Sequence, residues 1–190
     1  MQLLQRPEVS RQVAAPADAV WDVLADGWFY ATWVVGASRV RKVDRDWPAP
    51  GARLHHSVGP WPAVISDSTS VEEAEAPRRL VLRARGWPLG EARVIITVEP
   101  DGANQCTVTM VEDAITGPGR LVPMPLRQLG ILPRNQEALR RLALIAEGRH
   151  REQVAEDTEA GESADQTGSG RQDTRPRRAK KAPTKRSERT

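Results

Sequence analysis

Residues 133–149 have the sequence PRNQEALRRLALIAEGR, and the rest of the chain can be understood around this stretch. Its small and apolar residues recur every three or four positions, which predicts one buried face of an α-helix. Pro133 and Asn135 favour a helix start, and Gly148 favours a helix end. The expected core face consists of Ala138, Leu139, Leu142, Ala143, Ile145 and Ala146. The sequence therefore predicts a long amphipathic helix here.

Upstream of this helix the apolar residues alternate with a period of two, which predicts β-strands. A first strand is expected at 6–15, followed by short helices at 17–26 and 28–34. Further strands are expected at 38–46, 52–58, 63–75, 79–85, 91–99 and 105–115. The connections between these strands are short, so neighbouring strands must be antiparallel. Their shared apolar face needs cover, and the long helix is the element that can provide it.

Two other segments set the limits of the domain. Residues 117–132 contain three prolines and three glycines, yet they are apolar enough that we expect them to pack on the domain. Residues 151–190 have almost no large apolar side chains, which predicts a disordered tail, first acidic and then basic. Residues 1–150 are then one domain, long enough to bury about two thirds of its unfolded surface without a metal or disulfide.

Composition excludes several classes of protein. Cys106 is the single cysteine, so an internal disulfide and a cysteine-based zinc site are excluded, and a reducing, cytoplasmic location is expected. No segment approaches the ~20 apolar residues of a membrane span, and the N-terminus does not resemble a signal peptide. There is no Gly-rich phosphate loop, serine-elbow motif or His/Cys metal spacing, so we expect no cofactor and no metal.

The order strand, two helices, six strands and long helix resembles the START-like helix-grip proteins of the SRPBCC superfamily. APADAVWDVLAD at 15–26, Trp33, and EALRRLALIAEGR at 137–149 strengthen this likeness to the polyketide cyclase/dehydrase and lipid-transport group. The resemblance implies an α+β fold in which a curved antiparallel sheet wraps around the C-terminal helix and leaves an apolar cavity. Members bind sterols, lipids or polyketides, and some are enzymes. They share no catalytic motif, so the resemblance assigns no catalytic residue.

The position of the cavity mouth follows from strand order. In an antiparallel meander alternate turns lie at the same end, so turns 59–62 and 86–90, the second helix and segment 117–132 should meet. Trp33, Trp61 and Trp87 lie in these segments, and we expect them to form the rim of a ligand-binding mouth, with segment 117–132 as its lid. The alternative is that these tryptophans cap the hydrophobic core. Trp21 and Trp47 are better explained as structural. The residues expected to contact a ligand are Trp28, Tyr30, Trp33, Trp61, Trp87, Met110, Glu112, Leu121, Met124 and Leu142.

The candidates for acid–base chemistry in this cavity are His55, His56, Tyr30 and Glu112. Adjacent residues on a strand face opposite sides, so one histidine can face the cavity and the pair cannot easily chelate one metal. The alternative is that one histidine is solvated and the other packed. A buried Glu112 would need a partner such as Arg83 or Arg85, unless it forms a surface pair. Tyr30 could bond a ligand carbonyl or complete the core.

Three functions are compatible with these features. The leading interpretation is binding or transport of a small hydrophobic ligand, lipid or polyketide-like, in the internal cavity. The alternative is a polyketide cyclase or aromatase acting in the same cavity. In the third, the domain is an interaction module whose basic residues 171–190 contact nucleic acid or an acidic partner, although such a tail can also act as a solubilising segment.

Overall fold

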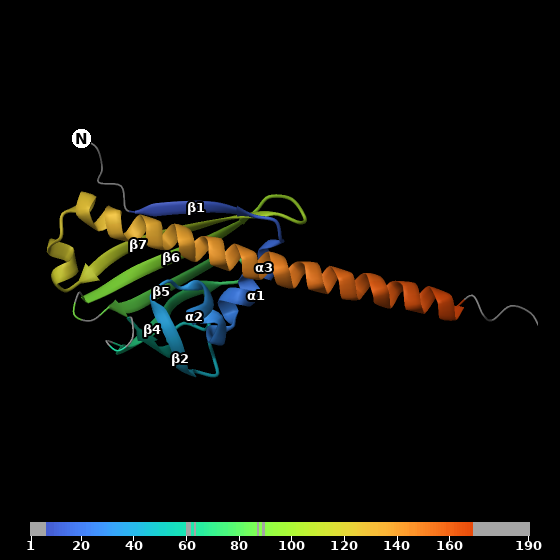
Figure 1. Cartoon of the computed structure of the whole chain (residues 1–190), viewed down its shortest axis with the longest axis horizontal. Coiled ribbons are helices and arrows are strands. Elements are labelled where there is room, and N and C mark those ends of the chain that lie inside the picture. Colours follow the sequence, from blue (N-terminus) through green and yellow to red (C-terminus); the bar gives the residue numbers. More distant parts are fainter. Residues whose placement is uncertain (1–6, 60–61, 63, 87, 89, 169–190) are drawn as a thin grey trace, which may run out of the picture. The chain divides into compact units, whose positions relative to one another are not determined.

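The computed structural model describes residues 7–59, 62, 64–86, 88 and 90–168. The chain divides into two compact units, Met1–Gln153 and Val154–Thr190. The first unit contains the β-sheet and the hydrophobic core (Figure 1). In the second unit the described side chains, 154–161, are exposed.

The elements follow the order expected from the sequence. The chain begins with strand β1 (Glu8–Val13), helix α1 (Ala17–Ala25), the 3-10 helix η1 (Gly27–Phe29) and helix α2 (Tyr30–Trp33). Six strands follow: β2 (Ala37–Val43), β3 (Arg53–Val58), β4 (Ile65–Glu75), β5 (Arg79–Gly86), β6 (Gly90–Pro100) and β7 (Cys106–Thr116). The 3-10 helix η2 (Pro118–Leu121) and helix α3 (Met124–Gly168) complete the described chain.

The seven strands form one antiparallel sheet in the order β1-β7-β6-β5-β4-β3-β2. Strands β2 to β7 are therefore a meander, and β1 is added at the free edge of β7. Figure 1 shows the part of α3 that belongs to the first unit running along one face of this sheet, with α1 and α2 beside it. The predicted α+β helix-grip fold is confirmed, including the antiparallel pairing.

The start of α3 differs from the prediction. The helix begins at Met124 and not at Pro133, which lies inside it. Proline has a helical φ angle, and its cost is one lost backbone hydrogen bond and a clash with the preceding turn. Segment 117–132 is only partly packed: Leu121, Leu126 and Leu129 are exposed, whereas the sequence predicts that the apolar residues of this segment are buried.

The end of α3 also differs from the prediction. The helix continues through Gly148 to Gly168, so residues 151–168, expected in the disordered tail, are helical. One glycine costs a helix about 1 kcal/mol, and the following residues are mostly Arg, Glu, Gln and Ala, which favour helix. Extending a formed helix requires no new nucleation. The remainder of the expected tail, 169–190, lies outside the described residues.

The core face of α3 is the one expected from its sequence. Ala138, Leu139, Leu142, Ala143 and Ala146 are all at most 5% exposed, and Ile145, also expected on this face, is partly buried. Polar contacts fix the helix near its packed end: the Glu147 carboxylate accepts a hydrogen bond from the Ala14 amide at 3.0 Å. The Arg149 guanidinium lies 3.9 Å above the Phe29 ring centroid. The amphipathic stretch therefore closes the inner face of the sheet.

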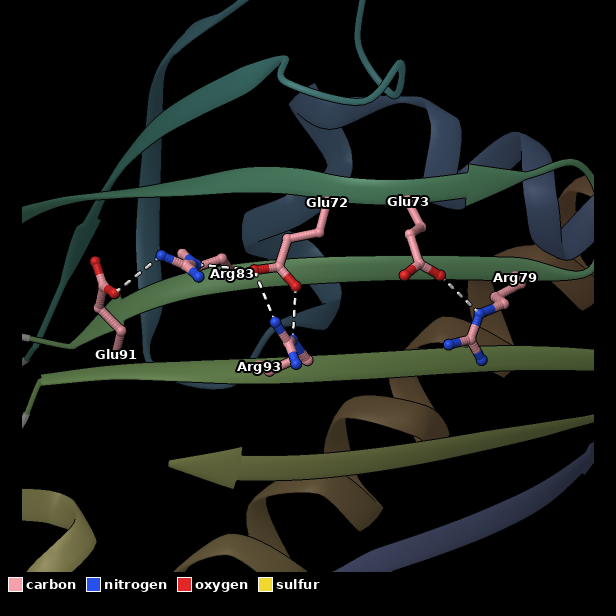
Figure 2. A network of polar contacts seen from close by, with 6 residues as sticks. All are labelled: Glu72, Glu73, Arg79, Arg83, Glu91 and Arg93. Carbon is pink, nitrogen blue, oxygen red and sulfur yellow. Dashed lines mark hydrogen bonds and ion pairs between the residues drawn. The ribbon is translucent and has the colours of Figure 1, made fainter. Parts of the chain in front are cut away.

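The outer face of the sheet carries an ion-pair network across β4, β5 and β6 (Figure 2). Glu72 accepts hydrogen bonds from Arg83 Nε at 2.8 Å and Arg93 Nε at 2.6 Å, and these bonds, first that from Arg93, lower the pKa of its carboxyl. Val81 lies on the outer face of β5, because its neighbours Leu80 and Leu82 point inward. Its side chain is nevertheless only 2% exposed. Long charged side chains cover apolar surface with their stems, which gives this network a structural role.

Candidate functional site

A cavity of about 470 Å³ lies between the inner face of the sheet and the first turns of α3. This volume is within the range of about 300–1,000 Å³ typical of small-molecule sites. The walls come from α2, the inner faces of β3, β5, β6 and β7, and the segment from η2 into α3. Most lining residues are apolar or small, among them Trp33, Val58, Leu82, Val94, Met110 and Ile131.

A row of small side chains explains why the protein's own side chains do not fill this space. Ala84, Ala92 and Ala114 are aligned across β5, β6 and β7, and Thr69 of β4 continues the row. All three alanines line the cavity. Further along the same strands the inward positions are occupied by larger, buried residues such as Leu80, and the interior is filled. The cavity is therefore built by side-chain size in register across three strands.

The cavity lies at the end of the sheet that strand order predicts. The residues after α2, the end of β3, the adjacent ends of β5 and β6, and the segment after β7 all contribute lining residues, including Gly36, Val58, Gly90 and Gly119. Gly90 has a φ of 114°, and a Cβ atom there would lie 2.1 Å from the Thr116 carbonyl oxygen. Glycine is thus required where β6 begins beside the end of β7.

A first polar cluster lies on the cavity wall and links α2, β3 and β4. The Thr69 hydroxyl is 3.0 Å from the Tyr30 hydroxyl and 3.1 Å from His56 Nε2. Burial raises the pKa of Tyr30 to about 12 and lowers the pKa of His56, so both groups are neutral near pH 7. His56 Nδ1 is enclosed and has no hydrogen-bond partner among the described residues.

A second polar cluster joins β7 to α3. The Glu112 carboxylate is 6% exposed, pairs with Arg134, and accepts a hydrogen bond from Asn135 Nδ2 at 3.0 Å. Glu112 and Arg134 both act on the pKa of Tyr30, so the two clusters are neighbours. The predicted partners were wrong: Arg83 lies in the outer network, and no bond joins Arg85 to Glu112 within the described chain.

Several predicted site residues come together at this cavity. Tyr30, Trp33, His56, Met110 and Glu112 line it. They come from three elements, α2, β3 and β7. On the two strands, the alternation of side chains places His56, Met110 and Glu112 on the inner face. Whether they bind a ligand remains a prediction.

Other predicted residues lie elsewhere. Trp28 is 60% exposed and Leu121 is 85% exposed, while Leu142 is completely buried in the core; none of these three lines the cavity. His55 alternates with His56 and is half-buried on the opposite face of β3. Trp61, Trp87 and the Met124 side chain lie outside the described part of the structure, as do the basic residues 171–190.

Three residues of the clusters were not predicted as site residues: Thr69, Arg134 and Asn135. The sequence predicts Asn135 at a helix start, whereas it lies inside α3. A detectable signal existed, because Asn135 precedes Ala138 by three positions and thus shares the apolar face of the helix. A polar residue on such a face needs a buried partner, and Glu112 is that partner.

Two classes of site are not found in the described part of the chain. Its His, Cys, Asp and Glu side chains form no group of three or more that could hold a metal ion. Its helices include none with the length and apolar character needed to cross a membrane.

Comparisons with known proteins agree with this architecture. A search of curated proteins returned no match. Among solved structures, a protein of Nitrosomonas europaea shares 17% identity with a TM-score of 0.58, covering 78% of this chain and 98% of that one. The Zhui aromatase/cyclase from Streptomyces sp. R1128 shares 19% identity with a TM-score of 0.58, covering 76% and 94%. CalU16 from Micromonospora echinospora shares 16% identity with a TM-score of 0.52, covering 80% and 83%.

These identities establish a shared fold alone. The family comparison goes further, because the model described as "Polyketide cyclase / dehydrase and lipid transport" matches residues 5–147. That range covers the sheet and the packed part of α3, and it agrees with the resemblance seen in the sequence. The chain therefore belongs to the polyketide cyclase/dehydrase and lipid-transport family of SRPBCC-type proteins.

Proposed function

We propose that this protein binds a small hydrophobic molecule in the cavity behind the alanine row. The observation that carries the proposal is a space of about 470 Å³ whose walls are mainly apolar, beside a core of buried side chains. Filling such a space with an apolar ligand removes both surfaces from water, which contributes about 25 cal/mol for each Å² of apolar area. Several residues of segment 119–131 line the cavity, and we expect this segment to act as a lid.

The test uses N-phenyl-1-naphthylamine, a neutral probe whose fluorescence increases in apolar surroundings. The wild-type protein should bind it saturably. In the Ala92→Leu variant three added carbon atoms occupy the cavity, and we expect at least about tenfold weaker binding, or a loss of 1.4 kcal/mol. The matched control is Ala103→Leu, which makes the same change in the exposed turn between β6 and β7, away from the cavity, and should bind like the wild type.

The thermal unfolding midpoint of each variant shows whether it is folded. A folded Ala92→Leu protein that binds the probe as tightly as the wild type would refute the proposal. Failure of the wild-type protein to bind any apolar probe, with its fold intact, would refute it as well.

A second candidate function is catalysis on a ligand held in the same cavity. The observation in its favour is that Tyr30, His56 and Glu112, which can each exchange a proton, line one cavity. One structural relative is named an aromatase/cyclase. Cyclisation of a poly-β-ketone chain requires proton removal between two carbonyl groups, for which a neutral imidazole or a carboxylate is a suitable base. Incubation with a poly-β-ketothioester should then give a cyclised product with the wild type but not with His56→Phe.

A further inference from the structure

Positive charge is in excess on the cavity wall. The charged residues of the lining are Arg85, Arg127, Arg134, Glu91 and Glu112. One of the two carboxylates, that of Glu91, is shared with Arg83, which lies outside the lining, at 3.5 Å. Residues 114–136, which supply much of one wall, contain three arginines and no aspartate or glutamate. The wall therefore favours a ligand that brings a negative charge.

Arg134 is the arginine that a molecule in the cavity can reach from α3. Gly130, Ile131 and Ala138 lie three or four positions from it along the helix, and all of them line the cavity, so Arg134 lies on the same helix face. Its side chain is 43% exposed. Arg127 differs, because its side chain is 16% exposed, its Nε is enclosed, and it pairs with Asp113 at 3.4 Å.

Two neighbours hold the Arg134 guanidinium and leave one of its nitrogen atoms unused. Nη2 donates to the buried Glu112 carboxylate, and Nε and Nη2 are each 3.4 Å from Asn135 Oδ1. Nη1 takes part in none of the hydrogen bonds that Arg134 makes with described residues. Since each Nη carries two N–H groups, Arg134 presents two further donors on a guanidinium whose orientation is already fixed.

We propose that Arg134 binds the carboxylate of an amphipathic ligand whose apolar part occupies the space behind the alanine row. Hydrogen bonds between arginine and a carboxylate are charge-assisted and about twice as strong as neutral ones. The ligand class is then a hydrophobic carboxylic acid, and not a hydrocarbon, an alcohol or a ketone. This inference rests on the proposed ligand-binding function and specifies its chemistry.

The experiment compares two probes of nearly identical shape, 2-naphthoate and 2-acetylnaphthalene, in which a carboxylate oxygen of the first is replaced by a methyl group. Their affinities are measured at pH 8 by displacement of N-phenyl-1-naphthylamine. We expect Arg134→Gln to lower the ratio of naphthoate affinity to ketone affinity by about tenfold, the lower end for a hydrogen bond to a charged group. The control Arg140→Gln removes the same charge from an exposed position of α3 and should leave the ratio unchanged.

A second background separates binding by Arg134 from repulsion by Glu112. In Arg134→Gln the Glu112 carboxylate loses its cation, and its charge alone would repel naphthoate. The Glu112→Gln background removes that charge and keeps an acceptor for Asn135 and for Arg134. Adding Arg134→Gln to this background should again lower the ratio about tenfold. A decrease that occurs only when Glu112 is charged overturns the inference.

A further measurement uses the wild-type protein and does not depend on the variants being folded. Carbon-13 NMR of carboxyl-labelled 2-naphthoate reports whether the bound probe is ionised. A carboxyl group has an ordinary pKa of about 4, an arginine partner keeps it ionised, and burial without a cation raises its pKa. We expect the bound probe to be ionised at pH 6, and a protonated bound probe at that pH overturns the inference.

The outcomes distinguish this inference from the proposed function. If N-phenyl-1-naphthylamine itself does not bind to the folded protein, the proposed function fails. If it binds but naphthoate does not displace it, or the ratio is the same in the wild type and Arg134→Gln, the cavity binds ligands and only the role of Arg134 is refuted.

Discussion

Tyr30 should resist ionisation far above the pH at which tyrosine ordinarily loses its proton. It is the sole tyrosine, it is 5% exposed, and burial is the main cause that raises its pKa from 10.0 to about 12. Glu112 and Asp67 act in the same direction, while the Thr69 hydrogen bond and Arg134 act against it. At pH 11 an unperturbed tyrosine is about 90% ionised, and a group with a pKa near 12 is about 10% ionised.

This pKa also predicts how stability depends on pH. The folded-state pKa is raised, so between pH 10 and 12 the unfolded chain loses the tyrosine proton while the folded protein keeps it. The unfolded state then binds fewer protons, and stability falls as pH rises through this window. At about 1.36 kcal/mol for each pKa unit, the difference between 10.0 and about 12 amounts to about 2–3 kcal/mol, most of it lost by pH 12 and the remainder above that pH.

The assay is an absorbance titration of tyrosinate, recorded together with far-ultraviolet circular dichroism. Because there is one tyrosine, the signal reports Tyr30 alone, and Tyr30→Phe is the blank. The folded protein should show little tyrosinate at pH 11, and the signal should appear at higher pH or with unfolding. In urea the same chain should titrate near pH 10. A folded protein with a midpoint near 10 would refute the enclosed, desolvated position of Tyr30 beside Thr69.

Two further predictions concern α3. Leu142→Ala should reduce the free energy of unfolding by about 2–5 kcal/mol because the side chain is completely buried, whereas Leu144→Ala, 49% exposed two residues later, should cost less than about 1 kcal/mol. Equal losses in urea denaturation would contradict the assigned helix face. Pro133→Ala should raise stability by about 1–3 kcal/mol because it restores a helical N–H and removes the clash with the previous turn. A lower unfolding midpoint would show that the chain at Pro133 does not follow a helical path.

The sequence by itself determined the order of the elements and the antiparallel pairing of strands β2 to β7, but not the two ends of α3. Alternation in segments such as 91–99 identified the strands, short connections required antiparallel neighbours, and the spacing from Ala138 to Ala146 gave the buried face of the helix. These patterns are local and repeat along the chain, so they can be detected without knowledge of distant contacts. Strand order also predicted the end of the sheet at which the cavity lies.

Only the tertiary structure decided what lies inside. Ala84, Ala92 and Ala114 are unremarkable in sequence, and they create a cavity because the strand register aligns them. Glu112 is hydrogen-bonded to Asn135, which lies 23 positions further along the sequence. Thr69, on β4, is hydrogen-bonded to both Tyr30 of α2 and His56 of β3. A local sequence pattern specifies the face of a strand or helix on which a side chain lies. The cavity and the hydrogen-bond partners of its polar residues depend on strand register and on how the helix crosses the sheet.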